Sequence, residues 1–165
     1  MSKYPKISDN NFNTKISKIY SDYRISKKPK TFDDICYPKK YNLQIPQQFV
    51  SQFINPKTKY NGLLIYHDIG AGKTCAALNI AEKFKGKKKI IICCPASLVG
   101  NMYKELLTPC VNNAYISKKD SEKLNKLNPL SKDYKKMIKV VEKRINKVYK
   151  ILSYHKFVNL YLKKK

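Results

Sequence analysis

The sequence has few acidic residues, only two arginines and no long apolar run, and each shortage narrows what the protein can be. The longest apolar stretch covers residues 90–99 and is interrupted by Pro95, so it is too short to cross a bilayer. Lys3 and Lys6 near the N-terminus are not followed by the apolar segment of a secretory signal. We therefore expect an intracellular protein without a membrane partner.

The charge of the chain is strongly one-sided. Asp and Glu total 11 against 35 Lys and Arg, which gives a formal net charge of +24. A charge of this sign predicts binding to a polyanion such as nucleic acid through its phosphates. Because lysine, asparagine, isoleucine and tyrosine share A/T-rich codons, part of the charge reflects genome composition. The charge alone therefore does not distinguish DNA from RNA.

The five cysteines do not have the paired spacing of a zinc site. Cys93 and Cys94 are adjacent in an apolar run, where cysteine behaves as a small apolar residue. The odd number of cysteines favours reduced thiols in a reducing compartment. His67 and His155 have no partner at a spacing that would form a metal site.

The chain of 165 residues suits one domain with an apolar core. We expect residues 1–40 to form a basic, poorly packed arm with a short helix at residues 11–20. From residue 41 onward strands alternate with helices, which predicts an α/β fold with a parallel sheet flanked by helices. The strands are expected at residues 62–66, 90–94, 113–117 and 148–153. The helices are expected at residues 46–54, 74–84, 97–107 and 133–147, with a polar surface excursion at 118–129 and a last helix or unpacked tail at 155–162.

One stretch carries the clearest chemical signal, Gly-Leu-Leu-Ile-Tyr-His-Asp-Ile-Gly-Ala-Gly-Lys-Thr at residues 62–74. An apolar strand leads into a glycine-bearing loop, and Lys73-Thr74 opens a helix. Such a loop turns successive backbone N–H groups inward, which forms a cup for the phosphates of a nucleoside triphosphate. Lys73 then supplies positive charge to the phosphates, and the Thr74 hydroxyl can ligate the accompanying Mg²⁺.

The loop departs from the general phosphate-loop pattern at one position. His67 stands where that pattern has its first glycine. Gly70 and Gly72 remain, and they permit backbone angles and a close phosphate approach that a Cβ would block. The alternative interpretation is a glycine-rich turn followed by a chance lysine.

Three sequence blocks resemble the first motor domain of superfamily-2 helicases. The nearest resemblance is to the Swi/Snf-like helicases of nucleocytoplasmic large DNA viruses, including their early-transcription-factor ATPases. The blocks are Leu-Gln-Ile-Pro-Gln-Gln-Phe-Val at residues 43–50, the phosphate loop at residues 60–74, and Lys-Ile-Ile-Ile-Cys-Cys-Pro-Ala-Ser-Leu at residues 89–98. A weaker fourth block is Ile-Leu-Ser-Tyr at residues 151–154. The resemblance covers about residues 41–155, and it implies an incomplete RecA-like ATP-binding domain at residues 41–165.

The resemblance implies a role for each matching residue. Lys73 and Thr74 would be catalytic, and Thr74 would also ligate the Mg²⁺ of Mg-ATP. The residues that bind ATP would be Gln47, His67, Asp68, Gly70, Ala71, Gly72, Lys73 and Thr74. The residues that bind nucleic acid would be Pro95, Ala96, Ser97, Ser153 and Tyr154.

Several of these residues have a structural interpretation beside the functional one. The Gln47 amide would hydrogen-bond the adenine edge, but a solvated helix glutamine is the alternative, and Gln48 is a rival for the same role. Ser97 would hold a nucleic-acid phosphate, or it would cap the helix that follows it. For Ser153 and Tyr154, packing at a buried strand end is the competing interpretation.

Helicase-type hydrolysis needs more than a phosphate cup. The family places an Asp-Glu pair after an apolar strand to hold Mg²⁺ and polarise the attacking water. None of the acidic residues after Lys73 follows such a strand, and no two of them are adjacent. The family also uses arginines from a second motor domain, which a chain of this length does not contain. We therefore expect a shortened or split frame, or a site completed by another chain, with weak nucleotide binding by this chain alone.

These observations favour an ATP-binding, helicase-like protein that acts on nucleic acid in viral transcription or genome handling. A viral origin would place it in the virion or the host cytoplasm, with a transcription complex or the rest of a motor as partner. The alternative is a non-catalytic basic module that binds nucleic acid or a transcription complex. A small phosphate-loop kinase is disfavoured, because it has no reason to share the first and third helicase blocks.

Overall fold

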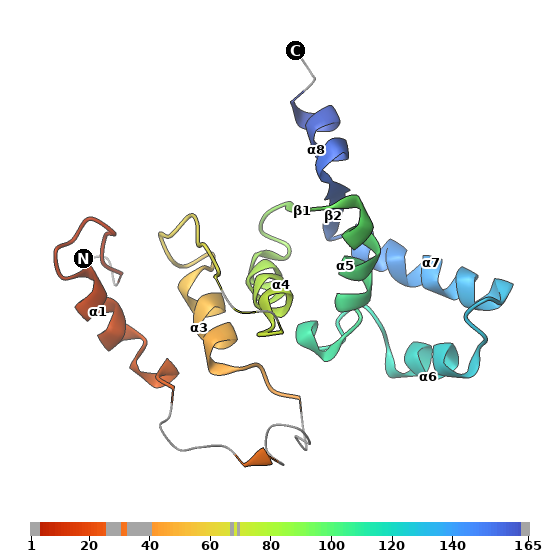
Figure 1. The fold of residues 1–165 in the computed structure, drawn as a ribbon, viewed down its shortest axis with the longest axis horizontal. Coiled ribbons are helices and arrows are strands. Elements are labelled where there is room, and N and C mark those ends of the chain that lie inside the picture. Colours follow the sequence, from red (N-terminus) through yellow and green to blue (C-terminus); the bar gives the residue numbers. More distant parts are fainter. Residues whose placement is uncertain (1–3, 26–30, 33–40, 67, 69, 163–165) are drawn as a thin grey trace. The chain divides into compact units, whose positions relative to one another are not determined.

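The computed structural model describes residues 4–25, 31–32, 41–66, 68 and 70–162 (Figure 1). It divides the chain into two compact units, residues 1–83 and 84–165. The secondary structure is mostly helical, with a small parallel sheet in the second unit. Over the described ranges, every helix is too short or too polar to cross a membrane. The boundary expected at residue 40 stays a prediction.

The helices of the first unit are α1 (Phe12–Ile19), α3 (Ile45–Phe53) and α4 (Lys73–Phe84), with a 3₁₀ turn at Ser21–Tyr23. Pro46 lies in the first turn of α3, where its missing N–H costs nothing. These positions confirm the helices predicted at residues 11–20, 46–54 and 74–84, with ends that differ by one residue.

Aromatic rings form the core of the first unit. The Tyr20 ring lies 5.3 Å from the Phe49 ring, edge to face, and the Phe53 ring stacks on Tyr60 at 4.4 Å. The Tyr20 hydroxyl donates a hydrogen bond to the Gln52 carbonyl at 3.2 Å. Burial raises the pKa of Tyr20 to about 12, so the phenol stays neutral in the core. Tyr20 therefore fastens the segment after α1 to α3.

The strand predicted at residues 62–66 is wrong, because the structure has no strand there. Leu64 is 88% exposed and Tyr66 is 90% exposed, so the apolar side chains have no covering layer. A strand needs a neighbour to pair its backbone N–H and C=O groups. None of the described residues supplies a paired neighbour for this segment, and an apolar pattern alone does not create one.

The second unit is built on two parallel strands, β1 (Ile90–Cys94) and β2 (Tyr149–Ser153). Their register pairs Ile90 with Tyr149 and Cys94 with Ser153. The crossover between them contains η2 (Ala96–Leu98), α5 (Val99–Glu105), η3 (Pro109–Val111), α6 (Lys118–Lys126) and α7 (Lys132–Asn146). Helix α8 (Tyr154–Tyr161) follows β2 directly. The strand predicted at residues 90–94 is confirmed in full, and the one at 148–153 begins one residue later.

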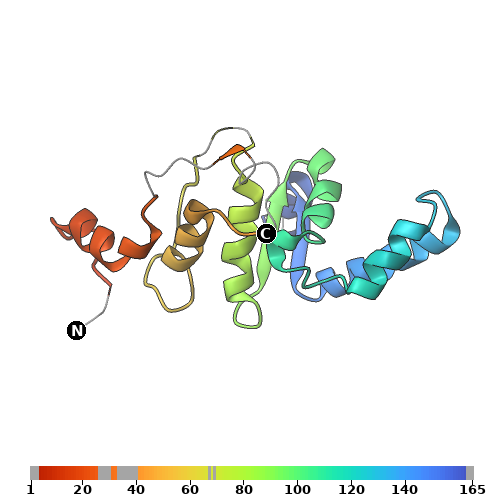
Figure 2. The ribbon, with the colours of Figure 1, turned by 90° about the horizontal axis from the view of Figure 1, so that it is seen from below.

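Serine caps start the helices of the crossover. The Ser117 hydroxyl accepts from the Asp120 N–H at the start of α6, and the Ser131 hydroxyl accepts from the Tyr134 N–H at the start of α7. Helices α6 and α7 lie side by side in both views (Figures 1 and 2), joined by an Arg144–Asp120 ion pair. The hydrogen bond from Arg144 is the main reason that the pKa of Asp120 is lowered.

The core of the second unit lies where α5 and α7 meet the sheet. Leu106 and Ile145 are fully buried, and Val141 is almost so. Tyr149 is buried at the start of β2 and packs edge to face on Tyr115 at 5.8 Å. In the helix predicted at residues 133–147, Val141 and Ile145 face this core, whereas Val140 is 49% exposed although it has an apolar side chain.

The strand predicted at residues 113–117 is wrong. These residues form turns, since Asn112 and Asn113 have φ values of 54° and 53°, which an extended chain does not allow. The polar excursion predicted at residues 118–129 is mostly exposed, but it contains helix α6, which buries Leu124. The expected parallel sheet flanked by helices is present only as a two-stranded sheet in the described ranges.

The described cysteines are of two kinds. Cys93 and Cys94 are free thiols. Burial, reinforced by the neighbouring Cys93, raises the pKa of Cys94, which keeps that thiol protonated. Cys75 and Cys110 are disulfide-bonded, so the prediction of reduced thiols is wrong for these two residues.

Two adjacent valines of α7 test this packing. Val141 is 1% exposed and Val140 is 49% exposed. We expect Val141→Ala to lower the free energy of unfolding by about 2 kcal/mol, because it removes buried methyl groups and leaves a cavity. Val140→Ala is the matched control and should change it by less than about 0.5 kcal/mol. Urea denaturation followed by circular dichroism measures both, and equal losses would contradict the described core.

Candidate functional site

The predicted phosphate loop adopts a turn that depends on its glycines. Gly70 has a φ of 83° and Gly72 a φ of 72°, values that residues with a Cβ rarely adopt. Between them, the Ala71 N–H donates a hydrogen bond to the Asp68 carbonyl at 3.2 Å. Helix α4 begins directly after Gly72. The loop is therefore bent rather than extended where it meets the helix.

Lys73 and Thr74 open α4. The Lys73 ammonium donates a hydrogen bond to the Asp68 carbonyl at 2.8 Å, so its side chain folds back over the loop. Thr74 is half-buried at the second position of the helix. The first N–H groups of a helix have no partner within it and attract anions, and α4 is twelve residues long. Helix start, lysine and hydroxyl are thus close together in the chain and in space.

Gln47 lies against this loop. Its side chain is 5% exposed, which makes the alternative of a solvated helix glutamine wrong. The Gln47 Nε2 donates to the Gly72 carbonyl at 3.2 Å, and Oε1 accepts from the Gln44 N–H at 2.9 Å. Gln48 is exposed and bonds instead to the Leu43 carbonyl. Of the two rival glutamines, the structure brings Gln47 to the loop.

The bond between Gln47 and Gln44 is a capping box, which closes the N-terminus of α3. Sequence reasoning missed this role, although two glutamines three residues apart around a proline are a usable signal for it. An amide has two N–H groups and two acceptor positions on its oxygen. The bond to the Gly72 carbonyl uses one N–H, and the bond from the Gln44 N–H uses one acceptor position. One N–H and one acceptor position of the Gln47 amide therefore remain for hydrogen bonds to a ligand.

A cavity of about 360 Å³ adjoins the loop. Its lining consists of Gln44, Pro46, Tyr66, Asp68 and Ala71. Asp68 and Ala71 were predicted to bind ATP, whereas Gln44, Pro46 and Tyr66 were not. The predicted residue His67 lies outside the described residues.

The metal assignment rests on Thr74 alone. In the described part of the chain, no three His, Cys, Asp or Glu side chains gather as a metal site would require. Asp68 is exposed at the loop, where its backbone carbonyl accepts from the Lys73 ammonium. No two of the acidic residues after Lys73 are adjacent in the sequence, unlike the carboxylate pair that the helicase resemblance implies.

The residues predicted to contact nucleic acid gather at one edge of the sheet in the second unit. Pro95, Ala96 and Ser97 follow the last residue of β1, and Tyr154 follows the last residue of β2. Because Cys94 pairs with Ser153, the two segments leave neighbouring positions at the carboxyl ends of parallel strands. Sequence reasoning placed these residues on two separate strands, and the structure brings them together.

The two serines of this edge have different surroundings. Ser153 is 8% exposed, and its hydroxyl accepts from the Lys156 N–H at 3.3 Å, which caps α8. Ser97 is exposed within η2, while the cap positions of η2 and α5 are Pro95 and Leu98. The alternative role of Ser97 is to cap the helix that follows it. In the structure Ser97 does not do so, and Ser153 caps α8 instead.

The chain is similar to viral proteins named as helicases. It is 53% identical over 157 residues to a candidate ATP-dependent RNA helicase of Acanthamoeba polyphaga mimivirus, which covers 95% of this chain and 27% of that protein. A second such helicase of the same virus is 32% identical over 122 residues, which cover 71% of this chain and 10% of that protein. A candidate helicase of Invertebrate iridescent virus 3 is 31% identical over 108 residues, which cover 57% of this chain and 11% of that protein. No family model and no solved structure matches the chain.

The chain is homologous to a part of these helicases of giant viruses and iridoviruses. It spans about a quarter of the first relative and about a tenth of the other two. The resemblance to viral helicases is confirmed at this level.

Gly72 and Gln47 provide a test of the loop. A Cβ on Gly72 would lie 2.3 Å from Gln47 Nε2, and the positive φ disfavours it as well. We expect Gly72→Ala to lower the free energy of unfolding by about 2 kcal/mol, measured by urea denaturation. Part of this loss should disappear when Gln47 is already alanine, since the crowded amide is then absent.

Gly62 is the matched glycine for this experiment. Its φ is not positive, and an added Cβ would meet nothing within 4 Å. Gly62→Ala should therefore change stability by less than about 1 kcal/mol. Equal losses of stability for Gly62→Ala and Gly72→Ala would contradict the described loop. A Gly72→Ala loss that stays the same when Gln47 is alanine would also contradict it.

The two strand-end serines provide a second test. We expect Ser153→Ala to cost about 1 kcal/mol of stability, because α8 loses its cap. Ser97→Ala should leave the free energy of unfolding unchanged within about 0.5 kcal/mol, since its hydroxyl caps neither η2 nor α5. Thermal denaturation of the two variants side by side measures the difference. A greater loss for Ser97→Ala would show that the caps are assigned wrongly.

Proposed function

We propose that the chain binds ATP at the loop of residues 68–74 and serves as part of a helicase-type motor that acts on nucleic acid. The observation that carries the proposal is the pair of positive φ angles at Gly70 and Gly72, followed at once by the start of α4. A loop bent by glycines before a helix N-terminus is suited to surrounding phosphate. The names of its viral relatives point to the same nucleotide.

The residues present fit a triphosphate in two respects. Gly70 and Gly72 bend the loop through their positive φ angles, and the Lys73 ammonium already lies over the loop on a carbonyl. Binding would move that ammonium from the Asp68 carbonyl to phosphate, which exchanges a neutral acceptor for a charged one. The free N–H and the acceptor position of Gln47 would then face the adenine edge.

Mg²⁺ would be held through Thr74 and the phosphates, and it would neutralise charge that develops on them. The described residues would contribute the Thr74 hydroxyl to that ion, and among them no group of three or more His, Cys, Asp or Glu side chains forms a metal site. Hydrolysis would therefore need acidic residues from elsewhere, and this chain's own part is to bind and position the nucleotide. A fold of the RecA-like class would put that site at the carboxyl ends of parallel strands.

Nucleic acid is the proposed polymer because of the formal charge of +24 and the strand-end residues of the second unit. Exposed Ser97 and Tyr154, at the ends of β1 and β2, would touch the backbone. The first relatives are named as RNA helicases, which favours RNA. The role that we propose for the chain is in viral transcription or genome handling. We place this role within the infected cell or the virion, together with a transcription complex or the rest of a motor.

A second candidate function is a basic module that binds nucleic acid without using ATP. It is favoured by one observation, namely that no two acidic residues after Lys73 are adjacent, unlike the Asp-Glu pair that helicase-type hydrolysis uses. The two functions differ in whether the loop has measurable affinity for nucleotide.

Lys73 separates the two candidates. We expect Lys73→Ala to weaken Mg-ATP binding roughly ten- to a hundredfold in calorimetry, because a charge-assisted contact to phosphate is lost. Lys83, in the last turn of the same helix, gives the matched control, and Lys83→Ala should bind ATP as the wild type does. Binding of a single-stranded oligonucleotide should be nearly unchanged in both variants.

The contrary outcomes are distinct. Wild-type protein without affinity at millimolar ATP would favour the module over the motor. Equal ATP affinity of Lys73→Ala and Lys83→Ala would show that the loop is not the site. Strong phosphate release by the pure chain, stimulated by nucleic acid, would show that the chain completes its own catalytic site.

A further inference from the structure

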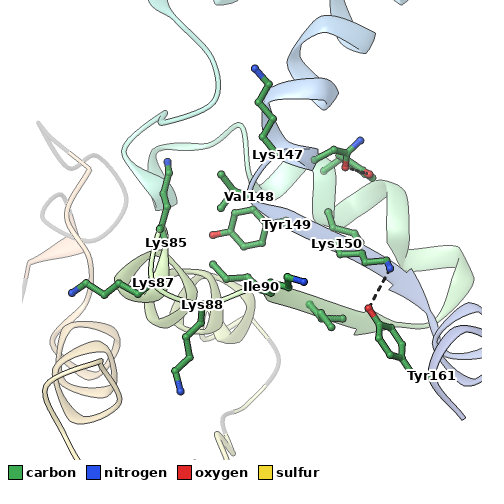
Figure 3. A pocket seen from close by; sticks show the side chains of 15 residues that line it. Lys85, Lys87, Lys88, Ile90, Lys147, Val148, Tyr149, Lys150 and Tyr161 are labelled. Atoms are coloured by element: carbon green, nitrogen blue, oxygen red, sulfur yellow. Dashed lines mark hydrogen bonds between the residues drawn. The ribbon is translucent and has the colours of Figure 1, made fainter.

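A pocket of about 940 Å³ lies in the second unit, away from the carboxyl ends of β1 and β2. It begins at the amino ends of β1 and β2 and extends along the sheet to the end of α8 (Figure 3). The basic residues that line it are Lys85, Lys87, Lys88, Lys89, Lys147 and Lys150. No acidic residue lines it. We call this feature the lysine pocket.

The backbone fixes the lysines that precede β1. Gly86 has a φ of 74°, and the Lys87 and Lys88 N–H groups both donate to the Phe84 carbonyl, at 2.9 and 3.0 Å. This tight turn puts a run of lysines at one end of the sheet. The side chains of Lys87 and Lys88 point outward from it in Figure 3, so they form a rim rather than a filled interior.

The floor of the lysine pocket is apolar and aromatic. Ile91, the second residue of β1, is 39% exposed, and Tyr161 at the end of α8 is 46% exposed. The Lys150 ammonium donates to the Tyr161 hydroxyl at 3.2 Å and lies 5.1 Å from the centre of its ring. Charge and a partly exposed aromatic residue thus occur together on one surface.

Six like charges around one cavity repel each other, and an anion would relieve that repulsion. We propose that the lysine pocket binds single-stranded nucleic acid, with phosphates at the lysine rim and a base against Tyr161 and the apolar floor. Stacking on aromatic rings within a basic groove is the mode by which single strands bind without sequence preference. An acidic polypeptide would also match the charge, but it has no base to stack on the partly exposed Tyr161 ring.

The pocket and the strand-end residues mark two ends of the same sheet. Strands of five residues put them about 17 Å apart. A single strand of nucleic acid bound at Ser97 and Tyr154 could therefore continue along the sheet into the lysine pocket. The choice of nucleic acid rests on the proposed function, whereas the pocket itself shares no residue with the ATP loop.

Three lysines of the pocket provide the test, one before β1, one before β2 and one within β2. The pocket variant combines Lys88→Gln, Lys147→Gln and Lys150→Gln. The matched control combines Lys132→Gln, Lys135→Gln and Lys139→Gln on the exposed face of α7, with the same loss of charge in the same unit. The probe is a fluorescein-labelled single-stranded oligoribonucleotide, with DNA of the same sequence as a second probe, read by anisotropy across a salt series.

Each phosphate contact contributes about −0.7 to the slope of log affinity against log salt for single strands. The pocket variant should therefore have a slope smaller in magnitude by about 2, and an affinity about 100-fold lower near 0.1 M salt. The control variant should keep most of the wild-type slope. Mg-ATP affinity should be unchanged in both, which separates this proposal from the ATP site.

Several results would overturn the proposal. Equal losses in the two triple variants would mean that only overall charge matters. Polyglutamate that displaces the RNA from wild type at matched charge concentration would identify the pocket as a site for acidic polypeptide. If the pocket variant fails to fold by circular dichroism, Lys147→Gln alone should still reduce the slope by about 0.7, and an unchanged slope would refute the site.

Discussion

The hydrogen bond from the Gln47 amide to the Gly72 carbonyl holds the candidate nucleotide loop in place. It joins α3 to the turn before α4, two segments that are 25 residues apart in sequence. A buried amide must satisfy its polar atoms, and Gln47 does so with the Gln44 N–H on one side and the loop on the other. The capping of α3 and the shape of the loop are therefore coupled through one side chain.

The second unit depends on a different constraint, the parallel pairing of β1 with β2. Parallel strands need a long crossover, and here it supplies α5 and α7, which pack on β2, together with α6, which packs on α7. The same pairing separates two sets of polar residues. Serine and tyrosine gather at the carboxyl ends, and lysines gather toward the amino ends. Such a sheet can offer two distinct contacts to one polymer.

Much of the local structure could be predicted from the sequence because it depends on nearby residues. Apolar spacing located α7, the continuous run at residues 90–94 located β1, and the glycines with Lys73 located the loop. The failures occurred where the outcome depends on distant partners. Residues 62–66 have the pattern of a strand but no strand to pair with, and the polar segment that became α6 buries Leu124 against a neighbour.

The amino-acid sequence by itself determined the positions of α1, α3, α4 and α7, the positive φ requirement of the loop and the kinship with viral helicases, because these depend on residue type and short spacing. Only the tertiary structure decided which glutamine reaches the loop, which serine is a cap and where six lysines meet. Those outcomes depend on which surfaces are buried and which segments become neighbours when the chain packs. Side-chain burial and long-range hydrogen bonding are properties of the folded chain, and no local pattern encodes them.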